Sequence, residues 1–288
     1  MRILLAVVVC ATLLAGCVST VVVGRSVTGA EVLNPLAAVQ LDGPAVAICS
    51  DGADVVVLEV SGTRLVVLDS LLQPGDTIPL TERLTAARGV LADRFYYYVY
   101  DDRALYRALK DRLRLDLWLS NVRVAGLAPY ATGEMLVCDD ERNLVWYKSL
   151  FGEGGRFLDP TAVADPGPIV ALPGGRFCVL DGGYRLVFFN RARVISGSVR
   201  LAEQYDLMAA DASGVLYLGR RGSNVVVLTD GKRQVFCELE EADGPIGFAV
   251  LTGPGSDSGT TPVVRLAVLD SGSRILLYRP PRLDRPAR

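Results

Sequence analysis

The sequence of 288 residues contains no histidine. Histidine is the usual general base of serine and cysteine hydrolases, a frequent metal ligand, and the side chain whose ordinary pKa lies nearest neutrality. Its absence excludes Ser-His-Asp and Cys-His catalysis, histidine metal sites and a histidine-based pH switch.

Other motifs typical of enzymes and nucleic-acid-binding proteins are also missing. No serine lies in a Gly-x-Ser-x-Gly sequence, and the glycine-rich segment 152–155 lacks the following helix and lysine of a phosphate-binding loop. The formal net charge is −2, which gives no general attraction for nucleic acid. We therefore expect a protein that is not an enzyme, uses no cofactor or metal, and binds no nucleic acid.

No hydrophobic run is long enough to cross a membrane as a helix, and the longest run lies at the N-terminus. Arg2 precedes an apolar run from Ile3 to Leu14, which is shorter than the roughly 20 residues of a membrane helix. One positive charge, a short apolar run and the small residues that follow predict a secretory signal peptide over residues 1–16. The tetrad Leu14–Cys17 (LAGC) resembles the lipobox of bacterial lipoproteins.

This resemblance implies that Cys17 is lipidated and becomes the mature N-terminus, so a lipid membrane is the first expected partner. Two or three acyl chains hold a protein on a bilayer stably. Val18 follows the cysteine in place of aspartate, which by resemblance to sorting rules favours the periplasmic side of the outer membrane. The alternative is an ordinary signal peptide with an accidental cysteine.

Internal repetition predicts the fold. A pair of apolar segments joined by a polar turn occurs six times. The second segments begin, at intervals of 40, 39, 42, 39 and 50 residues, with Leu65, Leu105, Leu144, Leu186, Val225 and Ile275. The last interval contains a loop-like insertion over 253–262 that is rich in Gly, Ser, Thr and Pro. Further short apolar segments flank each pair, and four short strands in about 40 residues are typical of a β-propeller blade.

We therefore predict an all-β fold, a six-bladed β-propeller of four-stranded blades over residues 17–279, with a Pro/Arg-rich tail over 280–288. The segment Leu105–Leu119 also has leucines at helical spacing, but its second half alternates with period two, which favours two strands joined at Lys110. The sixth repeat lacks a fourth strand. We expect the β-branched run Ser19–Val27 to supply it and close the ring.

Two repeats resemble the NHL family of six-bladed propellers in motif. A blade of that family carries an apolar residue, aspartate, a small residue, glycine, a variable residue, arginine and further apolar residues. The matching positions are Asp181, Gly182, Arg185 and Leu186 in one repeat and Asp270, Gly272, Arg274 and Ile275 in the other. The resemblance implies the fold and no single function, because propellers serve diverse roles.

Acidic residues at the repeated turns are candidate ligand-binding residues: Asp101, Asp139, Asp181 and Asp270. Similar six-bladed lactonases bind a divalent cation with oxygen ligands in a central channel, and carboxylates suit calcium. Aspartate at such a position is also an ordinary turn residue that accepts backbone N–H groups. The two interpretations remain open.

The densest aromatic stretch runs from Phe95 to Tyr100. On a strand, Tyr96, Tyr98 and Tyr100 share one side. Exposed, they form a platform for a sugar or a peptide; buried, they pack one blade against the next. Tyr96 and Tyr98 are therefore candidate binding residues.

Four cysteines lie beyond the signal peptide and Cys17, each in an apolar, strand-like segment and without CxxC spacing: Cys49, Cys138, Cys178 and Cys237. The repeat register places Cys138 and Cys178 on the same side of consecutive blades, where their side chains do not meet. We expect four free, mostly buried thiols.

These observations favour a membrane-anchored lipoprotein of the cell envelope whose propeller is a scaffold that binds another envelope protein. A metal-dependent lactonase or hydrolase is one alternative function. A structural envelope lipoprotein without a discrete ligand is the other.

Overall fold

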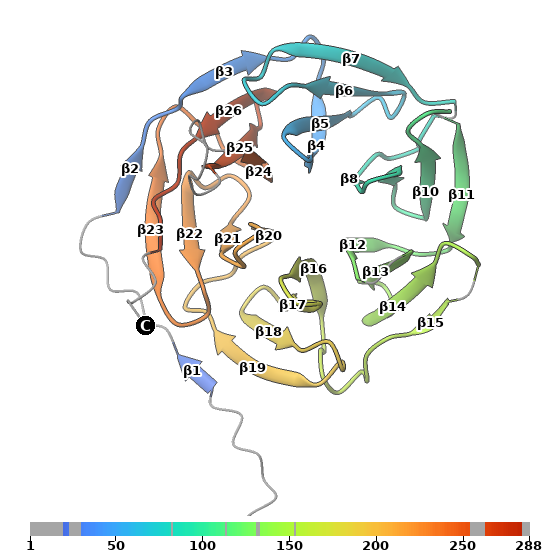
Figure 1. The fold of residues 1–288 in the computed structure, drawn as a ribbon, viewed down its shortest axis with the longest axis vertical. Coiled ribbons are helices and arrows are strands. Elements are labelled where there is room, and N and C mark those ends of the chain that lie inside the picture. The colour runs from blue at the N-terminus through green and yellow to red at the C-terminus, as the bar shows by residue number, and fades with distance from the viewer. Residues whose placement is uncertain are drawn as a thin grey trace, which may run out of the picture.

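The computed structural model describes residues 20–22 and 30–283, apart from positions 82, 113, 131–132, 153 and 254–262. These residues contain 26 β-strands and no helix. The strands form six sheets arranged as blades around a central axis (Figure 1). The predicted all-β, six-bladed propeller is confirmed. No helix of the described residues is long and apolar enough to cross a membrane.

Each blade is an antiparallel sheet whose first strand lies innermost. Blade 1 consists of β4 (Ala45–Asp51), β5 (Asp54–Glu59), β6 (Arg64–Leu68) and β7 (Pro74–Pro79). Blade 2 consists of β8 (Gly89–Ala92), β9 (Tyr96–Tyr100), β10 (Ala104–Leu109) and β11 (Leu115–Ser120). Blade 3 consists of β12 (Val124–Pro129), β13 (Glu134–Asp139), β14 (Leu144–Ser149) and β15 (Gly154–Arg156).

The second half of the ring repeats this order. Blade 4 consists of β16 (Pro166–Leu172), β17 (Arg176–Asp181), β18 (Arg185–Phe189) and β19 (Ile195–Arg200). Blade 5 consists of β20 (Leu207–Ala210), β21 (Leu216–Gly219), β22 (Val225–Thr229) and β23 (Gln234–Leu239). Blade 6 consists of β24 (Pro245–Gly253), β25 (Val263–Asp270), β26 (Arg274–Tyr278) and β3 (Ala37–Gln40).

The strand that closes the ring is β3, which pairs antiparallel with β26. The prediction that Ser19–Val27 closes blade 6 is wrong. Its described part, β1 (Thr20–Val22), instead adds a parallel fifth strand to β19 of blade 4, and the rest of that run lies outside the described residues. A third N-terminal strand, β2 (Glu31–Leu33), pairs in parallel with β23 of blade 5. A β-branched run fits any open sheet edge, so its pattern alone does not select the edge.

The hydrophobic core lies between adjacent blades. The second strands are largely apolar, because both of their faces pack on neighbouring blades; Val55, Val56, Val57 and Leu58 of β5 are fully buried. The segment Leu105–Leu119 forms β10 and β11, as predicted from its period-two half.

The four described cysteines are free and buried, as predicted. Cys138 packs in the cluster between blades 3 and 4, and Cys178 packs in the cluster between blades 4 and 5. The two thiols therefore point to the same side of their respective blades. Burial raises the pKa of each thiol, that of Cys237 to about 12.

Candidate functional site: the central channel

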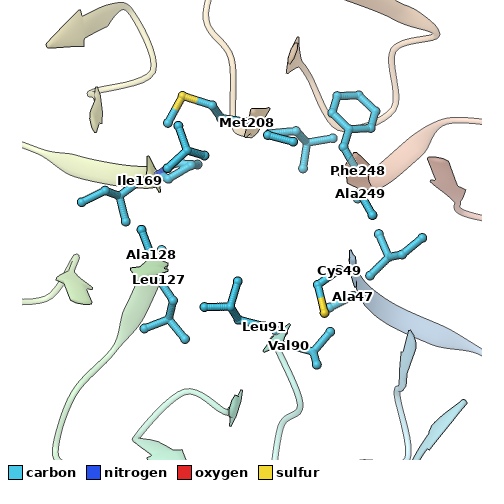
Figure 2. Close-up of a pocket in the computed structure, with 18 of the residues that line it drawn as sticks. Ala47, Cys49, Val90, Leu91, Leu127, Ala128, Ile169, Met208, Phe248 and Ala249 are labelled. Atoms are coloured by element: carbon cyan, nitrogen blue, oxygen red, sulfur yellow. The ribbon is translucent and has the colours of Figure 1, made fainter. Parts of the chain in front are cut away.

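The six innermost strands surround a cavity of about 380 Å³ on the propeller axis. Most of the side chains that line it are apolar, because the first strand of each blade carries mainly small and hydrophobic residues (Figure 2). The labelled side chains of Val90, Leu127, Ile169, Met208 and Phe248 come from five different blades and ring one opening.

Glycines let the channel strands approach each other closely. A Cβ atom on Gly126 of β12 would lie 2.7 Å from the backbone nitrogen of Ile169 on β16. A Cβ atom on Gly247 of β24 would lie 2.8 Å from Cγ2 of Ile48 on β4. Any larger residue at these positions would push two blades apart, so the glycines keep the channel narrow.

One mouth of the channel is polar. Arg88 directly precedes β8, and the ring of Tyr100 fills the space that a Cβ on the opposite Gly89 would occupy. From blade 5, the backbone N–H of Arg221 donates to the Asp206 carboxylate at 2.7 Å, and the Arg221 guanidinium lies 3.8 Å from the same carboxylate. All four side chains line the cavity.

Both arginines affect the pKa of the same side chain, Tyr100. Burial raises the pKa of Tyr100, and the positive charges of Arg88 and Arg221 partly oppose that rise. The tyrosine hydroxyl therefore lies within the field of one guanidinium from blade 2 and another from blade 5. Arg88 forms no ion pair with any residue that the structure describes. Its charge is thus available to an anion that enters this mouth.

Blades 2 and 5 lie opposite each other in the ring and differ from the other four (Figure 1). The inner strands of blades 1, 3, 4 and 6 each carry a register shift against the second strand, whereas β8 and β20 do not. In the same four blades, the acid that ends the second strand forms an ion pair with an arginine in the following turn or at the start of the third strand. These pairs are Glu59–Arg64, Asp139–Arg142, Asp181–Arg185 and Asp270–Arg274.

The acidic candidates lie at equivalent turns on one face of the ring, and each accepts backbone N–H groups. Asp101, Asp139 and Asp270 accept them from their own turn, and Asp181 accepts them from Ala164 and Asp165 in the segment before blade 4. Asp101 accepts the backbone N–H groups of Arg103 and Ala104 at 2.9 Å. Asp139, Asp181 and Asp270 also accept backbone N–H groups in addition to their arginine partners. Within the described residues no group of three His, Cys, Asp or Glu side chains is arranged to hold a metal ion. A binding role for these aspartates stays a prediction.

The aromatic candidates pack between blades 2 and 3. Tyr98 is buried there, and its hydroxyl donates to the Asp93 carboxylate at 2.8 Å. Tyr96 is half-buried beneath the Arg107 guanidinium, which lies 5.2 Å from the ring centroid. Neither lines the channel, whereas Tyr100, on the same side of the strand, does. A binding role for Tyr96 and Tyr98 also stays a prediction.

Sequence reasoning missed Arg88, Asp206 and Arg221. The available signal was the fifth repeat, which places Gly219 and Arg220 where other repeats carry the turn aspartate. That departure marks blade 5 as different, but it does not show that Arg221 faces Arg88 across a channel.

Known proteins resemble the chain in fold. No family model and no curated protein matches its sequence. A solved nidogen/laminin complex matches with a TM-score of 0.61 at 13% identity, covering 71% of this chain and 84% of that one. A virginiamycin B lyase from Staphylococcus aureus matches with a TM-score of 0.59 at 11% identity, covering 84% and 98%. Regucalcin from Agrobacterium tumefaciens, titled a calcium-binding protein, matches with a TM-score of 0.59 at 15% identity, covering 84% and 88%.

These similarities support the six-bladed, NHL-like architecture, and they correct one expectation. The prediction that the protein is not an enzyme is wrong as an inference from this fold, because virginiamycin B lyase and a streptogramin B lyase share it. The missing histidine excludes particular catalytic groups and not catalysis as such. At 10% to 15% identity these neighbours define the fold and leave the activity open.

Proposed function

We propose that this protein is a lipid-anchored propeller of the cell envelope that binds a small amphipathic anion in its central channel. The anchor is inferred from the lipobox-like tetrad ending at Cys17, which lies outside the described residues. The observation that carries the binding proposal is an apolar channel with two arginines, Arg88 and Arg221, at one mouth.

The channel has the properties of a small-molecule site. Such sites enclose roughly 300–1,000 Å³ and combine an apolar wall with a few placed polar groups, and this cavity of about 380 Å³ does the same. The apolar side chains of the wall offer an aliphatic or aromatic group dispersion and hydrophobic contacts. The mouth offers a carboxylate, sulfonate or phosphate the guanidinium of Arg88, together with that of Arg221 beside Asp206. The proposed ligand therefore has an apolar body and one acidic end.

Two probes of equal chain length test the proposal: decanoate, which carries the acid, and decan-1-ol, which does not. Calorimetric titration of the purified protein should show a single decanoate site. Decanoate should bind about a hundred-fold more tightly than the alcohol, because each of the two arginines can supply a charge-assisted hydrogen bond worth about 1.5–3 kcal/mol, which is at least about ten-fold in affinity. Equal affinity for both probes, or no binding of either, contradicts the proposal.

The same samples can also be used to test whether the protein converts the bound molecule chemically. A structural neighbour bound to quinupristin is titled a catalytically inactive variant of virginiamycin B lyase in which a histidine is replaced by alanine. This chain has no histidine, so chemistry in its channel would use other groups, such as Tyr100, which lines the cavity together with both arginines. Mass spectrometry of the ligand after incubation distinguishes binding from reaction.

The protein-binding scaffold predicted from the sequence is a second candidate function. The observation that favours it is a pair of large apolar side chains exposed at neighbouring parts of the outer edge of the ring, namely Val32 on β2 and Leu36 before β3. Crosslinking in intact membranes should then recover one stoichiometric envelope protein. The double variant Val32→Ser, Leu36→Ser should lose that crosslink, and an unchanged crosslink pattern contradicts this candidate.

A further inference from the structure

The two faces of the ring carry opposite charge in blades 2 to 4. One face consists of the described parts of the segments that join first to second and third to fourth strands: 93–95, 110–112 and 114, 130 and 133, 150–152, 173–175 and 190–194. These residues include six basic and two acidic side chains; we call this the basic face. The other face consists of segments 80–81, 83–88, 101–103, 121–123, 140–143, 157–165, 182–184 and 201–206. It holds eight acidic and five basic residues; we call it the acidic face.

The basic face also exposes apolar side chains. Phe151, in the turn after β14, is 91% exposed, and Phe95 and Val194 are more than half exposed. The Arg94 guanidinium lies 5.2 Å from the ring centroid of Phe95. Exposed aromatic residues among arginines are typical of surfaces that contact the interfacial region of a bilayer.

Hydrogen bonds across blade boundaries hold these turns on one surface. The Arg107 guanidinium of blade 2 donates to the carbonyl of Leu150, next to Phe151, at 3.4 Å. The hydroxyl of Tyr130 in blade 3 donates to the carbonyl of Arg191 in blade 4 at 2.7 Å. The exposed apolar residues of blades 2, 3 and 4 are therefore displayed in a fixed arrangement.

The inferred anchor enters the fold beside this surface. Thr20 pairs with Ser198 and Val22 pairs with Arg200, so Thr20 is the end of β1 nearer to Val194, where β19 begins. Cys17 is three residues from Thr20 and thus within about 11 Å of it, whatever path the chain takes. Ser198 lies about 13 Å along the strand from Val194. A lipid on Cys17 therefore keeps the edge of blade 4, and with it Val194, close to the membrane surface.

We propose that the basic face of blades 2 to 4, centred on Phe151 and Val194, rests on an anionic lipid surface. This proposal depends on the lipid anchor of the proposed function. Anionic head groups attract the basic face and repel the acidic face, and the short tether leaves little freedom to choose another orientation. Arg88 directly precedes the inner strand β8, and Arg221 follows the second strand β21, so both lie on the acidic side. This orientation therefore leaves the arginine mouth of the channel open to the compartment.

Site-specific fluorescence tests the orientation with the lipidated, full-length mature protein. The native thiols of the described residues are buried, so one new cysteine can be labelled selectively with an environment-sensitive nitrobenzoxadiazole dye. Ala192→Cys places the dye on the basic face, and Tyr184→Cys places it on the acidic face of the same blade. In vesicles of equal parts phosphatidylethanolamine and phosphatidylglycerol, the dye at position 192 should shift to shorter wavelength, and the dye at position 184 should not.

A second measurement uses the unlipidated Cys17→Ser protein, whose residual affinity for the same vesicles reports the basic face alone. Arg94→Ser and Arg191→Ser should each lower that affinity about five-fold, whereas Arg103→Ser on the acidic face should not lower it. Equal dye shifts on both faces, a shift only at position 184, or arginine effects of equal size on both faces overturn the proposal. A dye at position 192 that is shielded in native membranes but exposed in vesicles also overturns it, in favour of a protein partner.

Failure of the anchor is recognised separately by flotation. If the wild-type protein does not float with the vesicles, both the lipid anchor and the proposed orientation are wrong. If it floats but the dye at position 192 remains in water, only the proposed orientation is wrong.

Discussion

Gly126 tests whether close contact between inner strands holds the propeller together. Replacing it with alanine adds one methyl group on the side of β12 that faces β16. That methyl carbon would lie 2.7 Å from the nitrogen of Ile169, 2.9 Å from Cα of Pro168 and 3.0 Å from the carbonyl oxygen of Gly167. All three are backbone atoms, so no side-chain rotation relieves the contact. Blades 3 and 4 must separate at the channel wall.

We expect Gly126→Ala to lower the free energy of unfolding by about 1–3 kcal/mol, the usual cost of overpacking a well-packed core. The matched control is Gly197→Ala in β19, where an added Cβ would meet nothing within 4 Å. The control should be neutral or stabilise by up to about 1 kcal/mol, since alanine restricts the unfolded chain more than glycine does.

Urea unfolding followed by tryptophan fluorescence measures both changes, and the midpoint should fall for Gly126→Ala at an unchanged slope. If neither variant lowers the urea midpoint, the claim that β12 and β16 are packed at their limit is refuted. If both variants lower it equally, the effect comes from replacing glycine in a strand and not from contact between blades.

Three further outcomes follow from the same structure. Asp270 is fully buried and accepts bonds from Arg274, so Asp270→Ala should lower the free energy of unfolding by about 1–3 kcal/mol. Asp116 pairs with Arg114 on the exposed surface, so Asp116→Ala should lower it by less than about 1 kcal/mol. Similar losses for the two variants in chemical denaturation would contradict this. Burial, with a smaller effect of Asp51, raises the pKa of Cys49 from 9.0 to about 12. The folded state therefore holds more protons than the unfolded state between these values, and stability should fall as the pH rises above 9, by up to about 1.4 kcal/mol per unit for this thiol; a Cys49→Ala variant that loses as much stability as wild type between pH 8 and pH 10 would refute the assignment. Cys17→Ser should release the protein from membranes, and a wild-type mature N-terminus without acyl mass in mass spectrometry would remove the anchor.

The sequence predicted the blades well because each blade is local. The four strands of blades 1 to 5 follow one another in the chain, so the spacing of Leu65, Leu105 and their equivalents was enough to count them. The free thiols were predictable for the same reason, since the repeat register fixes which side of a strand Cys138 and Cys178 occupy.

Features that depend on ring closure were not predictable. The closing strand β3 is only four residues long and pairs with β26 from the far end of the chain, while the more obvious β-branched run joins blade 4. The channel mouth depends on closure as well. Arg88 and Arg221 are far apart in sequence and act on the same tyrosine only because blades 2 and 5 face each other.

The central claim is that the two arginines select an acidic ligand for the channel. Its most direct test is the ratio of decanoate to decan-1-ol affinity, measured by calorimetry in wild type, Arg88→Gln and Arg221→Gln, with Arg103→Gln as a control outside the channel lining. The account predicts that each channel variant lowers the ratio by about ten-fold, with little change in the affinity for the alcohol, and that the control leaves the ratio unchanged. A ratio that is the same in all four proteins would contradict the account.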